Sequence, residues 1–87
     1  MMADEKKISR LLKTARGQLD GILKMVEENR YCIDISQQLM ATEAILNRAN
    51  KEILAAHLEH CVKHAASEAD RQQKIDEFVD ALGRILR

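Results

Sequence analysis

Apolar residues recur at spacings of three and four along the first part of the chain, which is the pattern of one face of an α-helix. This pattern predicts a first helix from Asp4 to Glu28. The sequence ENRYC then interrupts it, and Asn29 favours the end of the helix because asparagine tolerates the left-handed backbone conformation. The predicted apolar stripe of this helix consists of Ile8, Leu11, Leu12, Ala15, Leu19, Ile22 and Val26.

The same periodicity resumes after the break and predicts a long second helix from Ile33 to Ala65. A helix of this length in a small domain is stabilised by a partner helix packed along it. One side of this helix carries Ile35, Leu39, Leu46, Ala49, Ile53 and His57, with Met40, Ile45 and Leu54 beside them.

The sequence ASEAD marks the next break, where Ser67 is expected to cap the amino end of a third helix. The apolar side of this helix consists of Ile75, Phe78, Val79, Leu82, Ile85 and Leu86. The composition agrees with an all-α fold, because the chain has no proline or tryptophan and is rich in residues that form helices. We predict one domain over residues 1–87, so small that oligomerisation is expected to complete its core.

The net charge does not indicate nucleic-acid binding, because 14 basic and 14 acidic residues give a formal value of zero. The basic residues of the first helix are nevertheless clustered, with no acidic residue between Glu5 and Asp20. The amino terminus MMADEKKISR lacks the apolar core of a signal peptide, and no apolar run is long enough to cross a membrane, so we expect a cytoplasmic protein. The absence of a glycine-rich phosphate loop or an evident acid–base pair argues against an enzyme.

The sequence AAHLEHCVKHA gathers three histidines and a cysteine near the end of the second predicted helix. His57 and Cys61 are four positions apart and therefore lie on one helical face, at a spacing that suits a metal ion. His60 and His64 lie to one side of that pair and are expected to face solvent.

The second cysteine of the chain, Cys32, precedes Cys61 by 29 positions. A continuous helix separates them by roughly 44 Å, so they cannot meet within one protomer. They can meet in an antiparallel dimer whose two-fold axis lies near Leu46 and Asn47, where Cys32 approaches His57 and Cys61 of the partner subunit. The spacing alone leaves open a metal site, a reactive thiol pair or plain buried residues.

The stretches RGQLDGILKMVEENRYCIDISQQLMA and HLEHCV resemble the CsoR-type family of small bacterial repressors. The resemblance rests on G-Q in the first helix, Y-C-I-D at the start of the second and H-x-x-x-C near its end. It implies a three-helix protomer, an antiparallel four-helix dimer core and a homotetramer made of two dimers. It also implies binding to double-stranded operator DNA, which is released when an inducer reaches the cysteine site.

The copper-sensing branch of this family uses Cys, His and Cys, which match Cys32, His57 and Cys61 and form a soft donor set suited to Cu(I). In that branch, side chains matching Tyr31 and Glu77 hold the histidine. The nickel/cobalt branch is set aside because the amino terminus lacks a histidine, and the formaldehyde branch because it generally lacks the second cysteine. The alternative is the persulfide-sensing branch, which typically lacks the histidine and crosslinks the two cysteines between subunits.

The resemblance also implies that DNA is bound by a basic face and not by a helix-turn-helix. The candidate DNA contacts are Lys6, Arg10, Lys13, Arg16 and Arg48. The family often carries an arginine immediately after the position of Lys13, where this chain has Thr14.

Overall fold

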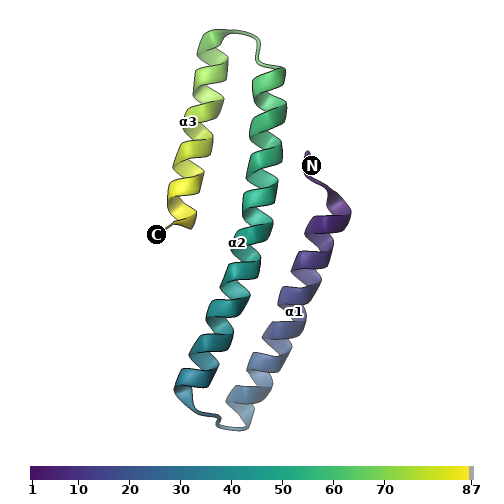
Figure 1. The fold of residues 1–87 in the computed structure, drawn as a ribbon, viewed down its shortest axis with the longest axis vertical. Helices are drawn as coiled ribbons and strands as arrows, with labels where there is room; N and C mark the ends of the chain where they lie inside the picture. The colour runs from purple at the N-terminus through teal and green to yellow at the C-terminus, as the bar shows by residue number, and fades with distance from the viewer. Residues whose placement is uncertain (87) are drawn as a thin grey trace.

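The computed structural model describes residues 1–86 and consists of α1 (Glu5–Glu27), α2 (Cys32–Lys63) and α3 (Glu68–Ile85), as Figure 1 shows. Arg87, the last residue of the predicted domain, lies outside the described residues. The all-α prediction is confirmed, and the ends of α1 and α2 lie within two residues of those predicted. Across residues 1–86, no helix has the length and apolar character needed to span a bilayer.

Local signals account for where the helices begin and end. The side chain of Asp4 accepts hydrogen bonds from the backbone N–H groups of Lys6 and Lys7 at 3.0 and 3.4 Å, which caps α1. Asn29 adopts the left-handed conformation with φ of 52°, as predicted for the end of this helix.

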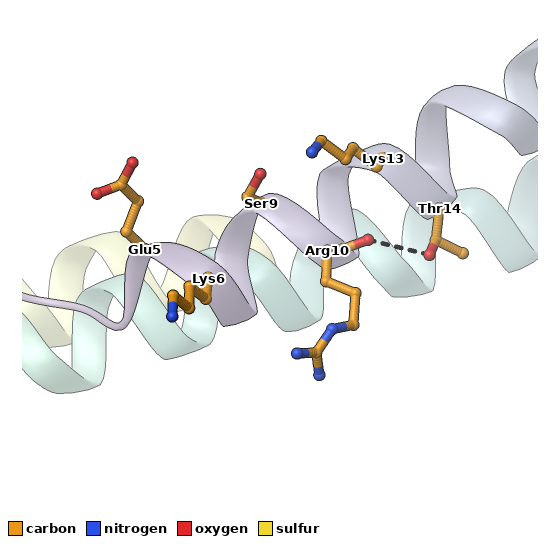
Figure 2. Close-up of a pocket in the computed structure, with 6 residues that line it drawn as sticks. All are labelled: Glu5, Lys6, Ser9, Arg10, Lys13 and Thr14. Atoms are coloured by element: carbon orange, nitrogen blue, oxygen red, sulfur yellow. Dashed lines mark hydrogen bonds between the residues drawn. The ribbon is translucent and has the colours of Figure 1, made fainter.

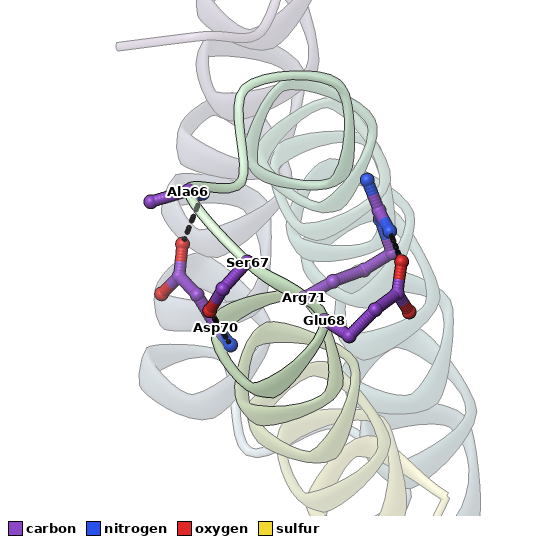
Figure 3. Close-up of polar contacts among 5 residues, drawn as sticks. All are labelled: Ala66, Ser67, Glu68, Asp70 and Arg71. Carbon is purple, nitrogen blue, oxygen red and sulfur yellow. Dashed lines mark hydrogen bonds and ion pairs between the residues drawn. The ribbon is translucent and has the colours of Figure 1, made fainter.

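The predicted cap of α3 is confirmed. Ser67 Oγ accepts a hydrogen bond from the Asp70 N–H at 3.1 Å, and the Asp70 carboxylate accepts one from the Ala66 N–H at 3.1 Å (Figure 3). An ion pair between Arg71 and Glu68 supports the same turn. These reciprocal contacts satisfy amide groups that the first turn of a helix leaves unpaired.

The three helices form a flat layer with α2 in the middle (Figure 1). Helix α1 packs antiparallel along the amino-terminal part of α2, and α3 packs antiparallel along its carboxy-terminal part. Over residues 1–86, α1 and α3 do not contact each other. The protomer measures 56 × 27 × 12 Å, so it is about one helix thick and has room for only a narrow core.

The core of the protomer is a narrow seam between α1 and α2. Ile8, Ala15 and Ile22 recur every seventh residue on α1, and Thr42 and Ala49 do the same on α2. All five are 2–6% exposed, and their spacing is that of helices packed side by side as in a coiled coil. At the centre of this seam, the Thr42 hydroxyl donates a hydrogen bond to Gln18 Oε1 at 2.8 Å.

The rest of the predicted apolar stripes stays largely uncovered in the protomer. We define the exposed seam as five residues of these two stripes, each 42–57% exposed, namely Leu12, Leu19, Val26, Leu39 and Leu46. Leu12 of α1 and Ile53 of α2 line one open hollow, so the two stripes adjoin there on one face of the helix pair. One neighbouring helix covers only part of so wide a stripe, which leaves the rest of each stripe uncovered in the protomer.

We expect Thr42→Val to lower the free energy of unfolding by about 1 kcal/mol, because it removes the hydroxyl that joins α2 to Gln18 while keeping the side-chain volume. Thr14→Val is the matched control, since Thr14 is exposed and donates only to the Arg10 carbonyl oxygen within its own helix. Its effect should stay within about 0.5 kcal/mol. Urea unfolding followed by circular dichroism at one fixed protein concentration measures both, and equal effects would contradict the role of the contact.

Candidate functional site

His57 and Cys61, two of the predicted metal ligands, lie side by side near the carboxy-terminal end of α2. The His57 Nε2 and Cys61 Sγ atoms lie 3.4 Å apart. Two donors on one ion of zinc's size lie roughly 3.5–3.8 Å apart, given bonds of about 2.3 Å to sulfur and 2.0 Å to nitrogen. His57 is exposed and Cys61 half-buried, so a metal ion fits this pair after an adjustment of a few tenths of an ångström.

Cys32 lies at the opposite end of the same helix. It is the first residue of α2, it is exposed, and both cysteines are free thiols. The helix is continuous from Cys32 past Cys61, as predicted, which keeps the two thiols roughly 44 Å apart. Over residues 1–86, no three side chains of His, Cys, Asp or Glu gather closely enough to hold a metal ion. One protomer therefore supplies two separate parts of the predicted ligand set.

Neither Tyr31 nor Glu77, the residues expected to hold the histidine, forms a hydrogen bond with it in the described part of the protomer. Tyr31 is the exposed N-cap of α2 and lies beside Cys32 in the chain, at the far end of the helix from His57. Glu77 lies on α3, where its carboxylate is 3.9 Å from the ammonium group of Lys74. Over residues 1–86, no hydrogen bond joins either residue to His57.

The amino-terminal half of α1 presents a basic surface. Lys6, Arg10 and Lys13 are exposed and line an open hollow of about 720 Å³ together with Ser9 and Thr14 (Figure 2). Over residues 1–86, none of the three basic side chains pairs with a carboxylate, although Glu5 borders the hollow. Unpaired, exposed cations on one helix face are available to bind an anionic partner.

The two remaining predicted DNA contacts, Arg48 and Arg16, line different hollows. Arg48 of α2 and Arg10 of α1 line one hollow of about 270 Å³, so the structure extends the basic surface onto α2. Arg16 lines the hollow that contains Leu12 and Ile53, beside the exposed seam, and Lys13 borders this hollow as well. Lys7, a neighbour of these residues in the sequence, binds Glu52 of α2 at 2.9 Å. Lys6, Arg10, Lys13 and Arg48 therefore define one basic surface, and Arg16 lies at its edge.

The sequence did not reveal that His60 and His64 form a pair. Their ring centroids are 4.5 Å apart, and both side chains line a hollow next to Met2. The spacing of four residues was the available signal, but the nearby His57–Cys61 pair has the same spacing.

Comparison with known proteins identifies the family. The model of the family described as metal-sensitive transcriptional repressor matches residues 4–84. The copper-sensing transcriptional repressor CsoR of Mycobacterium ulcerans (strain Agy99) is 48% identical over 71 residues, which cover 82% of this chain and 61% of that protein. This chain thus spans about three fifths of the length of that relative. CsoR of Bacillus subtilis (strain 168) is 34% identical over 84 residues, covering 97% of this chain and 83% of that protein.

Two solved structures share the fold. The nickel-responsive transcriptional regulator InrS matches with a TM-score of 0.77 and 30% identity, over 98% of this chain and 96% of that one. The copper-sensing repressor CsoR with Cu(I) from Geobacillus thermodenitrificans NG80-2 matches with a TM-score of 0.76 and 38% identity, over 94% and 85%. These matches confirm the resemblance drawn from the sequence: the chain belongs to the metal-sensitive transcriptional repressor family, which consists of regulators and not of enzymes.

Proposed function

We propose that this protein is a cytoplasmic, DNA-binding transcriptional repressor that leaves its operator when Cu(I) binds between two of its subunits. The observation that carries the proposal is the 3.4 Å approach of His57 Nε2 to Cys61 Sγ on a helix whose other end bears Cys32. Relatives named copper-sensing repressors support copper as the inducer. The protein acts by binding and release and not by catalysis.

The subunits assemble as an antiparallel dimer. The exposed seam of the α1–α2 pair packs against the same seam of a second copy, which gives a four-helix core around a two-fold axis near Leu46 and Asn47. This arrangement brings Cys32 of each subunit to His57 and Cys61 of the partner subunit, and it creates two identical sites. Two such dimers form the tetramer that binds operator DNA.

The donor set explains the choice of metal. Two thiolates and one imidazole are soft ligands, and Cu(I) accepts such a set at low coordination number. In the dimer, Tyr31 and Glu77 hold the imidazole of His57 by hydrogen bonds, which links the site to α3. Because each site needs ligands from both subunits, Cu(I) binding shifts the helices of the dimer relative to one another. This shift also moves the basic surface on α1.

Persulfide sensing is the second candidate, and the accessibility of the thiols favours it. Cys32 is exposed, Cys61 is half-buried, and neither forms a disulfide in the protomer. A persulfide donor RSSH transfers its outer sulfur to one cysteine thiolate and releases RS⁻. Attack of the other thiolate on the inner sulfur of the resulting cysteine persulfide then forms the disulfide between Cys32 and Cys61 of the partner subunit and releases HS⁻, without involving His57. The response of a His57 variant therefore separates the two candidates.

The DNA surface is tested by the triple variant Lys6→Ala, Arg10→Ala, Lys13→Ala. We expect weaker binding to the DNA upstream of the protein's own gene, because the variant loses contacts to phosphate groups. Each lost contact should also reduce the steepness of the fall of log affinity with log salt by about 0.9. Fluorescence anisotropy across a series of salt concentrations measures both quantities.

The matched control is the triple variant Lys63→Ala, Lys74→Ala, Arg84→Ala, which makes the same change in net charge. Its three residues lie on α2 and α3, away from the basic surface, and each is paired with a carboxylate on its own helix. This control should retain the affinity and the salt slope of the parent. Equal losses in both variants would show that net charge alone matters, and an unchanged slope in the first would rule out this surface.

A further inference from the structure

His60 and His64 are left unused by the proposed Cu(I) site, although they are arranged as ligands. They lie in the last turn of α2 and at its C-cap, and the centroids of their rings are 4.5 Å apart. We propose that this pair is a second metal site, which binds a divalent transition ion of intermediate softness such as Zn²⁺ or Ni²⁺.

The geometry of the helix supports two-point binding. Residues four positions apart lie one above the other on a helix, and two histidines at this spacing are an established way to hold zinc on a helical face. The hydrogen bond from the His64 N–H to the His60 carbonyl oxygen, at 3.1 Å, keeps this last turn helical. The two imidazoles therefore need only ring rotations to direct one nitrogen each at a common ion.

The surroundings leave room for the rest of the coordination shell. Both histidines are exposed and line an open hollow of about 280 Å³ together with Met2, Ala56 and Glu59. A water molecule occupies roughly 30 Å³, so several fit beside the ion. Over residues 1–86, no third His, Cys, Asp or Glu joins the pair closely enough to ligate, so water completes the shell.

The local charge favours a cation at this position. The carboxy-terminal end of a helix carries a partial negative charge, and His60 and His64 stand at that end of α2. Glu59 and Lys63 border the same hollow and form an ion pair at 3.4 Å, so the Lys63 ammonium is balanced by a carboxylate.

The two pairs on α2 differ in direction and in chemistry. His57–Cys61 and His60–His64 interleave in the sequence but face directions about 60° apart around the helix. The first pair includes a thiolate and suits a soft ion. The second offers only imidazoles, which suit zinc and nickel. One helix end therefore presents two sites of different selectivity.

The test uses the full chain carrying Cys32→Ser and Cys61→Ser, so that no thiolate competes for the metal. Zn²⁺ is titrated into this protein, with binding followed by calorimetry and the histidine ring nitrogens followed by NMR. We expect one zinc ion per protomer, with shifts at the ring nitrogens of His60 and His64. Adding His64→Ala should abolish this binding, whereas adding His57→Ala, the matched control, should leave it unchanged.

Two results would overturn the proposal. One is the absence of shifts at His60 and His64 at saturating zinc, and the other is equal zinc affinity with and without His64→Ala. Helix content measured by circular dichroism verifies that each variant is folded, which is expected because His60 and His64 are exposed. Since the cysteines are absent throughout, neither result bears on the proposed Cu(I) site.

Discussion

Replacing Cys61 with serine is expected to abolish tight Cu(I) binding and, with it, release of the protein from DNA. The change leaves each proposed site with one thiolate and one imidazole, which is too few soft donors for Cu(I). The loss should exceed the roughly 10–100-fold that follows removal of an outer hydrogen-bonding partner of a metal ligand. Competition with a Cu(I) chelator measures affinity, and gel shift with and without Cu(I) measures release. Retention of both properties in Cys61→Ser would exclude the proposed ligand set.

His57→Ala distinguishes copper sensing from persulfide sensing. Because both thiolates remain, Cu(I) binding should weaken less than Cu(I)-dependent release, which requires the imidazole that Tyr31 and Glu77 are proposed to hold. His60→Ala is the matched control, since His60 is an exposed histidine of the same helix outside the ligand set. If His57→Ala responds normally to a persulfide donor, and the parent stays on DNA when loaded with Cu(I), copper sensing is wrong.

Placing aspartate at both Leu19 and Leu46 is expected to break the dimer. These side chains are 44% and 42% exposed in the protomer, so the change leaves the buried contacts between α1 and α2 intact. In the proposed dimer the carboxylates would be buried in an apolar interface, and each unpaired buried charge costs several kcal/mol. A protomer one helix thick cannot make up this loss, so we expect monomers of low helix content.

Sedimentation velocity and circular dichroism over a dilution series measure the effect of the double aspartate variant. Leu86→Asp is the control, because Leu86 is 70% exposed at the end of α3, outside the exposed seam. A double variant that sediments like the parent at every concentration would contradict the proposed interface.

Local sequence determined where the helices of this protein begin and end. Asp4, Asn29 and Ser67 act on backbone groups within a few residues of themselves, so their effects were predictable without knowing the neighbouring helices. The spacing of His57 and Cys61 likewise fixed their approach, because one helix turn brings them together. The length of α2 fixed the separation of its two thiols.

Tertiary structure decided which apolar side chains are buried and which basic side chains remain exposed and unpaired. The apolar stripe of α1 is continuous in the sequence, yet Ile8 is buried and Leu12 exposed, because α2 covers only part of the stripe. Likewise, the packing of α1 against α2 binds Lys7 to Glu52, places Arg48 beside Arg10 and leaves Arg16 at the edge of the exposed seam. These outcomes depend on how far each helix is rotated toward its neighbour, and periodicity within a single helix does not specify that rotation.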